Sequence, residues 1–165
     1  MAANDITASP SIAITGFGEA HWNARIVGDW LDYFVDKLGE GATLFFDFRM
    51  LLRDPEKAEI VSPGVDGTDQ TTILAIYGEP KFPDVMIQCT KDIKNQYPDL
   101  RLIIGKCRSG FHRNDTSCRT MECVTNNLRH EDGPMNAKYF PTINCRGRRD
   151  IDNQMRAFED WLEKP

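Results

Sequence analysis

Short runs of apolar residues recur along the chain, far enough apart to leave room for a helix between them. Such runs are typical of strands that are buried on both faces of a sheet. The clearest run is LRLIIG, which ends in a glycine. The expected strands are residues 11–17, 43–48, 100–105 and 140–145.

Between these runs, apolar residues recur every three or four positions, which is the period of an α-helix with one buried face. In residues 113–129, Cys118, Met121, Val124 and Leu128 follow this spacing. Strands that alternate with helices predict a three-layer α/β fold, a mostly parallel, Rossmann-like sheet with helices on both faces. The expected helices are residues 23–38, 69–77, 83–97, 113–129 and 151–162.

Length and composition are those of one globular domain. The chain has 165 residues, of which 41% are hydrophobic and 27% are charged. Residues 1–10 are small and polar and predict a flexible arm, and no repeat or linker divides residues 11–165. The chain has no apolar run as long as a membrane span. Its first residues have neither the basic nor the apolar segment of a secretion signal, so we do not expect it to be secreted. We expect its five cysteines to be reduced, in the cytoplasm or another reducing compartment.

Charge is distributed unevenly along the chain. The net charge is −5, but residues 101–149 hold ten Lys and Arg against four acidic residues, a local charge of +6. The rest of the chain therefore carries −11. This third of the chain can attract an anion, unless the segregation averages out in the fold.

The segment between the strand 100–105 and the helix 113–129 has the composition of an anion-binding loop. Ligands of parallel α/β sheets bind beyond the carboxyl ends of strands, where loops lead into helix N-termini. Gly110 lets the loop turn its backbone N–H groups inward, and the helix that follows adds its positive end. Arg113 can hold a phosphate through two parallel hydrogen bonds, and Ser109 and His112 are further donors.

The same loop also fits an enzyme. Cys107 and Arg113, separated by five residues with a glycine between them, match the loop of cysteine-dependent phosphatases. In those enzymes a thiolate attacks phosphorus and the arginine holds the phosphate oxygens. An acid must also protonate the leaving group, and Asp47 and Asp69 are the candidates. Lys106 stands where such loops normally carry histidine, which weighs against this alternative.

Four segments resemble the C-terminal domain of the RapZ family of RNase adapter proteins. IGKCRSGFHR (104–113) resembles the family's G-C-T-G-G-x-H-R-S motif, and FGEAH (17–21) resembles its F-G-F-K-H segment. FDFR (46–49) resembles F-D-V-R, and PGVDGTD (63–69) resembles R-P-M-T-G-L-D. The segments keep the family's order, and the likeness covers roughly residues 12–145.

This resemblance implies a function and a set of ligand-binding residues. The family domain is a compact α/β unit, similar to part of phosphofructokinase, that binds an aminosugar phosphate and self-associates. In the bacterial adapter it also binds small regulatory RNA and an endoribonuclease. Since Asp47 and Arg49 alternate with phenylalanines, we expect both to project from one face of a strand. The implied ligand-binding residues are Cys107, Ser109, Gly110, His112, Arg113, His21, Asp47 and Arg49.

Two differences from the family limit what the resemblance implies. No G-x-x-x-x-G-K-[S/T] motif occurs, so ATP binding by a nucleotide-binding domain is not expected. The family's basic C-terminal tail is replaced here by the acidic residues 157–165. An RNA or protein contact would therefore depend on Arg146, Arg148 and Arg149, which otherwise form a solvated turn.

We therefore predict a domain that binds or senses a phosphorylated small molecule, with no metal and no cofactor. The Cys and His residues lack the spacing of zinc ligands. Several site residues also have a structural interpretation. Cys107 can be a small buried side chain, Arg49 can form an ion pair with Asp47 or Asp54, and Asp69 can cap a helix.

Overall fold

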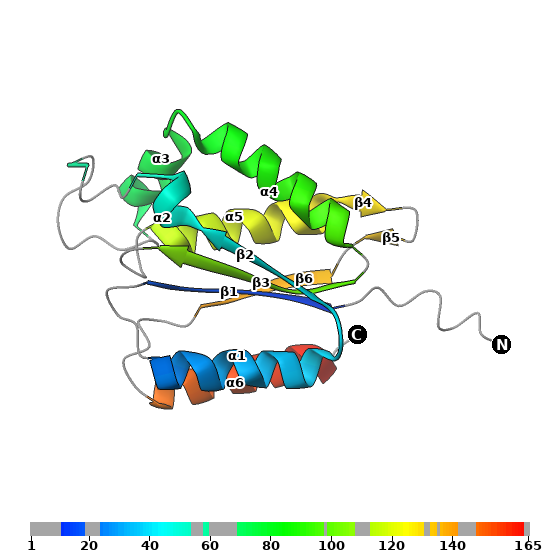
Figure 1. Cartoon of the computed structure of the whole chain (residues 1–165). Coiled ribbons are helices and arrows are strands. Elements are labelled where there is room, and N and C mark those ends of the chain that lie inside the picture. Colours follow the sequence, from blue (N-terminus) through cyan, green and yellow to red (C-terminus); the bar gives the residue numbers. More distant parts are fainter. Residues whose placement is uncertain are drawn as a thin grey trace.

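Three layers make up the fold (Figure 1). In the computed structural model the central layer is a four-stranded parallel sheet in the order β2-β3-β1-β6. The three-layer α/β fold predicted from the sequence is thereby confirmed. The strands are β1 (Ser11–Gly18), β2 (Ala42–Asp47), β3 (Leu100–Cys107) and β6 (Asn136–Pro141). The structure describes residues 11–18, 24–53, 58–59, 69–97, 99–107, 113–130, 133–134, 136–141 and 148–163.

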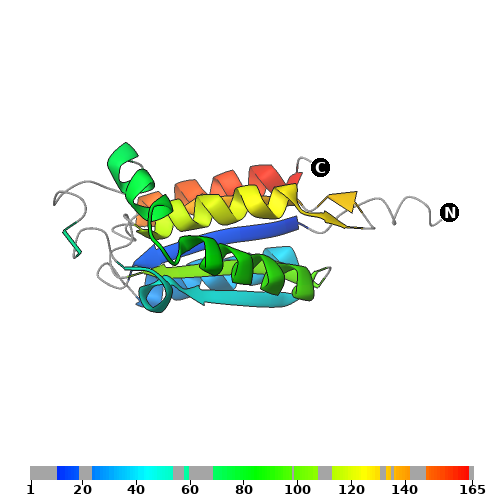
Figure 2. The ribbon, with the colours of Figure 1, turned by 90° about the horizontal axis from the view of Figure 1, so that it is seen from above.

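Helices cover both faces of the sheet (Figures 1 and 2). One face carries α1 (Ala24–Leu38) and α6 (Arg148–Glu163). The opposite face carries α2 (Phe48–Leu51), α3 (Gln70–Tyr77), α4 (Phe82–Gln96) and α5 (Arg113–Asn127). A two-stranded antiparallel hairpin follows α5 and is formed by β4 (Arg129–His130) and β5 (Gly133–Pro134).

Most expected elements lie within a few residues of their predicted bounds, but the last strand does not. It was expected at residues 140–145 and is found at Asn136–Pro141. Its residues point alternately to the two faces of the sheet: Ala137 and Tyr139 are buried in one core and Phe140 in the other, whereas Lys138 is exposed. The polar residues Asn136 and Lys138 interrupt the apolar pattern, so hydrophobicity did not reveal where this strand begins.

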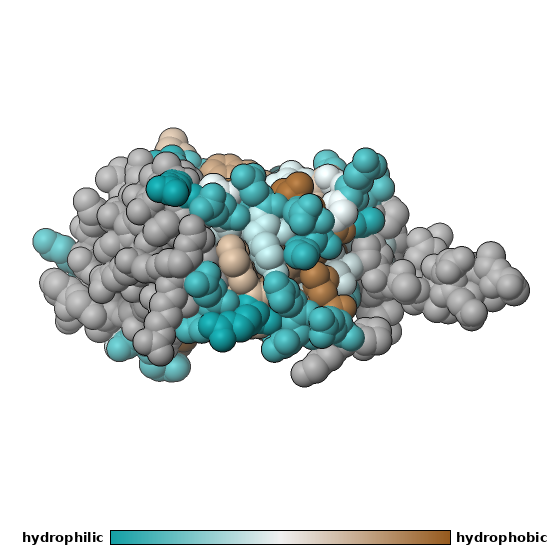
Figure 3. Space-filling view, turned by 90° about the horizontal axis from the view of Figure 1, so that it is seen from below, coloured by the Kyte–Doolittle hydropathy of each residue, from teal (hydrophilic) through white to brown (hydrophobic). Residues whose placement is uncertain are grey.

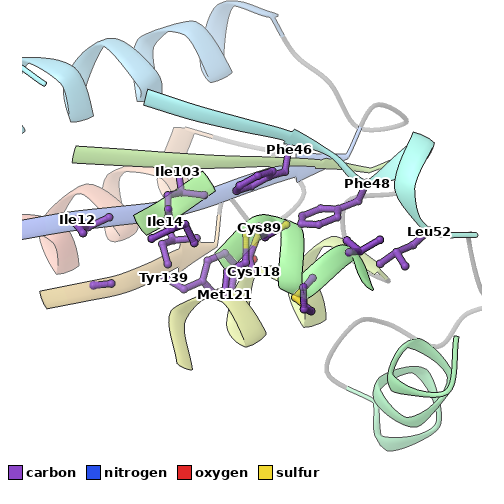
Figure 4. Close-up of a cluster of buried hydrophobic side chains, with 14 of the residues drawn as sticks. Ile12, Ile14, Phe46, Phe48, Leu52, Cys89, Ile103, Cys118, Met121 and Tyr139 are labelled. Carbon is purple, nitrogen blue, oxygen red and sulfur yellow. The ribbon is translucent and has the colours of Figure 1, made fainter. Parts of the chain in front are cut away.

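A hydrophobic core lies on each side of the sheet, because successive strand residues point to opposite faces. On the α3–α5 side, Ile12, Ile14 and Ile103 of the sheet pack with Cys118 and Met121 of α5 (Figure 4). The apolar stripe predicted for this helix is thereby confirmed at its first two positions, while Val124 and Leu128 are half-buried. Cys118 is part of this core and is unsuited to a metal site.

Aromatic side chains fill the core on the α1–α6 side. Trp30 and Phe34 of α1 contact each other edge-on, with ring centroids 4.2 Å apart, and Phe158 of α6 contacts Phe34 at 4.6 Å. Thr15 is a buried polar residue in this layer. Its hydroxyl accepts a hydrogen bond from the indole N–H of Trp30 (3.0 Å) and donates one to the Phe140 carbonyl (2.9 Å). One side chain thereby joins β1, β6 and α1.

The outer surface of this layer mixes hydrophilic side chains with separate apolar ones (Figure 3). Val35 of α1 is one such apolar residue, with 55% of its surface exposed. The longest described helix, α6, has 16 residues. Within the part of the chain that the structure describes, no helix has both the length and the apolar character that crossing a membrane requires.

Replacing Thr15 tests the polar contact inside the aromatic core. In Thr15→Val the buried Trp30 N–H loses its acceptor, so we expect the free energy of unfolding to be about 1–3 kcal/mol lower than that of the wild type. Urea denaturation measures this difference. Thr43→Val, at an exposed position of β2, is the matched control and should change stability by less than about 0.5 kcal/mol. Equal stability of the two variants would show that the hydroxyl contributes nothing.

Candidate functional site

The carboxyl ends of three strands meet at one edge of the sheet. In the β1–β3 ladder Gly18 pairs with Cys107, and in the β2–β3 ladder Asp47 pairs with Lys106. The residues that follow β1, β2 and β3 therefore start from one edge, as predicted. In a parallel sheet this is the edge where ligands bind.

Helix α5 starts at this same edge. It begins at Arg113, six residues after β3 ends at Cys107, and it packs along β1, β3 and β6. The side chain of Arg113 lies outside the described part of the structure. The positive end of a fifteen-residue helix is thus placed at the edge of the sheet. The predicted site residues His21, Ser109, Gly110 and His112 lie outside the described residues.

Cys107 is the last residue of β3 rather than part of a loop. Its side chain is buried, with 1% of its surface exposed, and belongs to the core cluster that contains Cys118 and Met121. Reactive cysteines sit in partly exposed positions, whereas inert structural cysteines are buried. The structure therefore favours the packing role of Cys107 over a nucleophilic one.

Asp47 and Arg49 form an ion pair at the end of β2. Arg49 donates from Nε to Asp47 Oδ1 (2.8 Å) and from Nη2 to Oδ2 (2.5 Å), so both carboxylate oxygens are engaged. The hydrogen bonds from this guanidinium, together with the Arg49 backbone N–H and the charge of Lys106, lower the pKa of Asp47 below its ordinary value. The structural interpretation of Arg49 as the partner of Asp47 is thereby confirmed. Both side chains remain about one quarter exposed.

The expected alternation of these two residues along a strand is wrong. Strand β2 ends at Asp47, and Phe48 begins the short helix α2. Asp47 is the N-cap of that helix, since its carboxylate accepts the Arg49 backbone N–H at 3.1 Å. The cap turns the chain before Arg49, so the arginine folds back onto Asp47 instead of projecting beside it.

Asp69 also caps a helix, as its structural interpretation predicted. Its carboxylate accepts hydrogen bonds from the Thr71 backbone N–H (3.0 Å) and the Thr71 hydroxyl (2.7 Å) at the start of α3. Both aspartates considered as the acid of a phosphatase are therefore engaged in helix caps. A carboxyl group that protonates a leaving group must itself be protonated, which a raised pKa favours. The pKa of Asp47 is instead lowered.

A pocket of about 400 Å³ lies beside α2, and no motif in the sequence predicted it. Inside it, Glu79 is buried with 5% of its surface exposed, and it accepts from Arg53 Nε at 2.8 Å. The two residues are 26 positions apart, so no local motif could reveal the pair. The pocket is lined by Arg49, Met50, Leu51, Leu52, Arg53, Glu79, Pro80 and Lys81.

Two of the three arginines in the basic cluster of Arg146, Arg148 and Arg149 belong to a helix. Arg148 and Arg149 were expected in a turn, but they begin helix α6. Their side chains, and the whole of Arg146, lie outside the described part of the chain. Their expected contact with RNA or a protein partner stays a prediction.

Replacing Asp47 separates its role as a helix cap from its role in the ion pair. We expect Asp47→Ala to lower the free energy of unfolding at pH 7 by about 0.5–2 kcal/mol, through loss of the cap and of the Arg49 contact. Asp47→Ser keeps a capping hydroxyl, so its free energy of unfolding should lie between those of the wild type and Asp47→Ala. Urea denaturation gives all three values.

The pH dependence of the same variants tests the charge. Because folding lowers the pKa of Asp47, its carboxylate stabilises the fold above the unfolded-state pKa of about 4. This contribution is lost as the pH falls through the lower, folded-state value. The difference between wild type and Asp47→Ala should therefore shrink below about pH 4. A difference that stays constant with pH would show that the carboxylate acts through its shape alone.

The Arg53–Glu79 pair can be tested with a double-mutant comparison. Arg53→Ala leaves the buried Glu79 carboxylate without the cation that the described residues give it, so we expect a lower urea midpoint. Adding Glu79→Leu removes the buried charge and should restore part of the loss. If the double variant is no more stable than Arg53→Ala, Glu79 does not depend on Arg53.

The described residues bring together the ends of β1, β2 and β3, the Asp47–Arg49 pair and the start of α5. Within the same residues, no group of three or more His, Cys, Asp or Glu side chains is placed to hold a metal ion. Comparison of the chain with protein-family models, with curated proteins and with solved structures finds no match.

Proposed function

We propose that the chain binds a phosphorylated small molecule, such as an aminosugar phosphate, at the carboxyl edge of its sheet. The observation that carries this proposal is the connection from β3 to α5. Strand β3 ends beside β1, where Cys107 pairs with Gly18, and the next described residue, Arg113, begins α5. A strand-to-helix connection at this edge is where parallel α/β sheets bind phosphate groups.

The charges around the connection support an anionic ligand. Helix α5 contributes the partial positive charge of its N-terminus, and Arg113 is its first residue. Lys106, next to Asp47 in the sheet, adds a third positive group at this edge. In the proposed site Arg113, His112 and backbone N–H groups of residues 108–112 hold the phosphate.

The resemblance to the RapZ C-terminal domain supports a sugar phosphate in particular. In the proposal, His21 and Asp47 contact hydroxyl or amine groups of the sugar. The Asp47 carboxylate is about one quarter exposed and ionised, so it can accept a hydrogen bond from such a group while it stays paired with Arg49.

Binding without turnover is the version that the described residues favour. The thiol of Cys107 is buried, and a phosphatase needs it to reach phosphorus. The two candidate acids, Asp47 and Asp69, are held in helix caps. We therefore propose a sensor or adapter domain rather than a cysteine-dependent phosphatase.

Calorimetric titration with glucosamine 6-phosphate tests the proposed site. We expect Arg113→Ala to weaken binding about 10- to 150-fold, which corresponds to about 1.5–3 kcal/mol for a lost charged hydrogen bond. Arg156→Ala, at an exposed position of α6, removes the same charge elsewhere and should leave the affinity unchanged. An unchanged affinity in Arg113→Ala would refute the assignment of the site.

The same samples distinguish the alternatives. Hydrolysis of para-nitrophenyl phosphate that disappears in Cys107→Ser would replace the proposal with a phosphatase. RNA binding that weakens steeply with salt, and is lost when Arg146, Arg148 and Arg149 are neutralised, would favour an RNA adapter. Inorganic phosphate that binds as tightly as glucosamine 6-phosphate would show that the sugar makes no contact.

A further inference from the structure

Strand β2 forms one edge of the sheet. It pairs with β3 on one side, and among the described residues no strand lies on its other side (Figure 2). The register with β3 is irregular between Ala42 and Thr43 and regular from there to Asp47. Edge strands are commonly protected against pairing by lysine or proline, and the β2 sequence ATLFFD contains neither. Its outer backbone groups are therefore suited to pair with another strand.

A groove of about 300 Å³ runs along this edge. Phe45 and Phe46 both line it, although neighbouring residues of a strand point to opposite faces, so the groove must follow the outer edge of β2. Helix α4 forms the other wall with residues at helical spacings of three and four, and α2 contributes two more. The residues that line the groove are Phe45, Phe46, Asp47, Met50, Leu51, Val85, Gln88, Cys89 and Asp92.

The walls of the groove are mostly apolar: Phe46, Val85 and Cys89 are buried, while two other apolar residues are exposed. These two are Phe45 and Met50, with 53% and 80% of their surfaces open to solvent. Cys89 lies at the inner wall, where burial raises the pKa of its thiol to about 12, so it stays a neutral apolar group. Because exposed Phe and Met are costly to hydrate, an apolar side chain that covered them would be bound favourably.

The charged side chains of the groove are all acidic. Asp47 is paired with Arg49, while Asp92 of α4 is half-buried and accepts a hydrogen bond from the amide of Gln88 at 3.0 Å. Because the Gln88 amide carries no net charge, this hydrogen bond does not neutralise the negative charge of Asp92. A partner that enters between α4 and β2 would therefore be favoured if it carried Lys or Arg.

We propose that this groove binds an extended, basic peptide segment of a partner protein, which adds to β2 as a fifth strand. The backbone of Thr43–Asp47 supplies main-chain hydrogen bonds, and an apolar side chain of the peptide covers the exposed Phe45. Because neighbouring residues of a strand point to opposite faces, the Lys or Arg beside that apolar residue lies on the α4 side and pairs with Asp92. This function does not depend on the proposed phosphate site, and its residues apart from Asp47 are not part of that site.

The test uses a fluorescein-labelled heptapeptide of alternating lysine and valine, with binding measured by fluorescence anisotropy. We expect saturable binding to the wild-type chain and at least a tenfold loss of affinity in Asp92→Lys. Asp84→Lys makes the same change at an exposed position of α4 outside the groove and should change affinity less than twofold. A glutamate–valine peptide of the same length should not bind.

Two further peptides test the strand pairing itself. They carry N-methyl groups on the odd-numbered or the even-numbered amides, and a peptide strand turns only one of these sets toward β2. We expect one peptide to lose binding and the other to retain it. Equal binding of both would overturn the strand addition, and so would binding that Asp92→Lys leaves intact. The proposal would also be overturned if the lysine–valine peptide did not bind and a second copy of the chain paired with β2 in solution.

Discussion

The ladder between β1 and β3 is the constraint on which the rest of the structure depends. Both strands are central, with a core cluster on each face, so a shift of one residue would move every apolar side chain to the wrong side. The register that buries Ile14 and Ile103 therefore also places Gly18 beside Cys107. Core packing alone brings the segments after these strands to one edge, before any ligand contributes.

The end of β2 shows how one short contact directs two neighbouring regions. Asp47 caps α2 and holds Arg49, and this turn places Met50 and Leu51 between the two pockets. The carboxylate oxygens are occupied by the chain itself, so Asp47 serves first as a structural group. At the same edge the N-terminus of α5 supplies a partial positive charge that does not depend on Asp47.

Local patterns sufficed where a single element is built around one buried face. The apolar spacing in residues 113–129 predicted α5, and the Asp69 cap could be read from its position before α3. The pattern failed at β6, where the polar residues Asn136 and Lys138 interrupt it, and at Phe48, where an aromatic run continues from a strand into a helix. Helix and strand cannot be told apart by hydrophobicity in so short a run.

The sequence by itself determined the α/β class and most of its helices and strands, and it predicted an anion site at the β3–α5 connection. Only the tertiary structure decided that Cys107 is buried, that Arg49 turns back onto Asp47, and that Glu79 meets Arg53. It alone also formed the groove between β2 and α4. The physical reason is that periodicity encodes which face of an element is buried. Contacts between residues far apart in the chain depend instead on how those faces pack together.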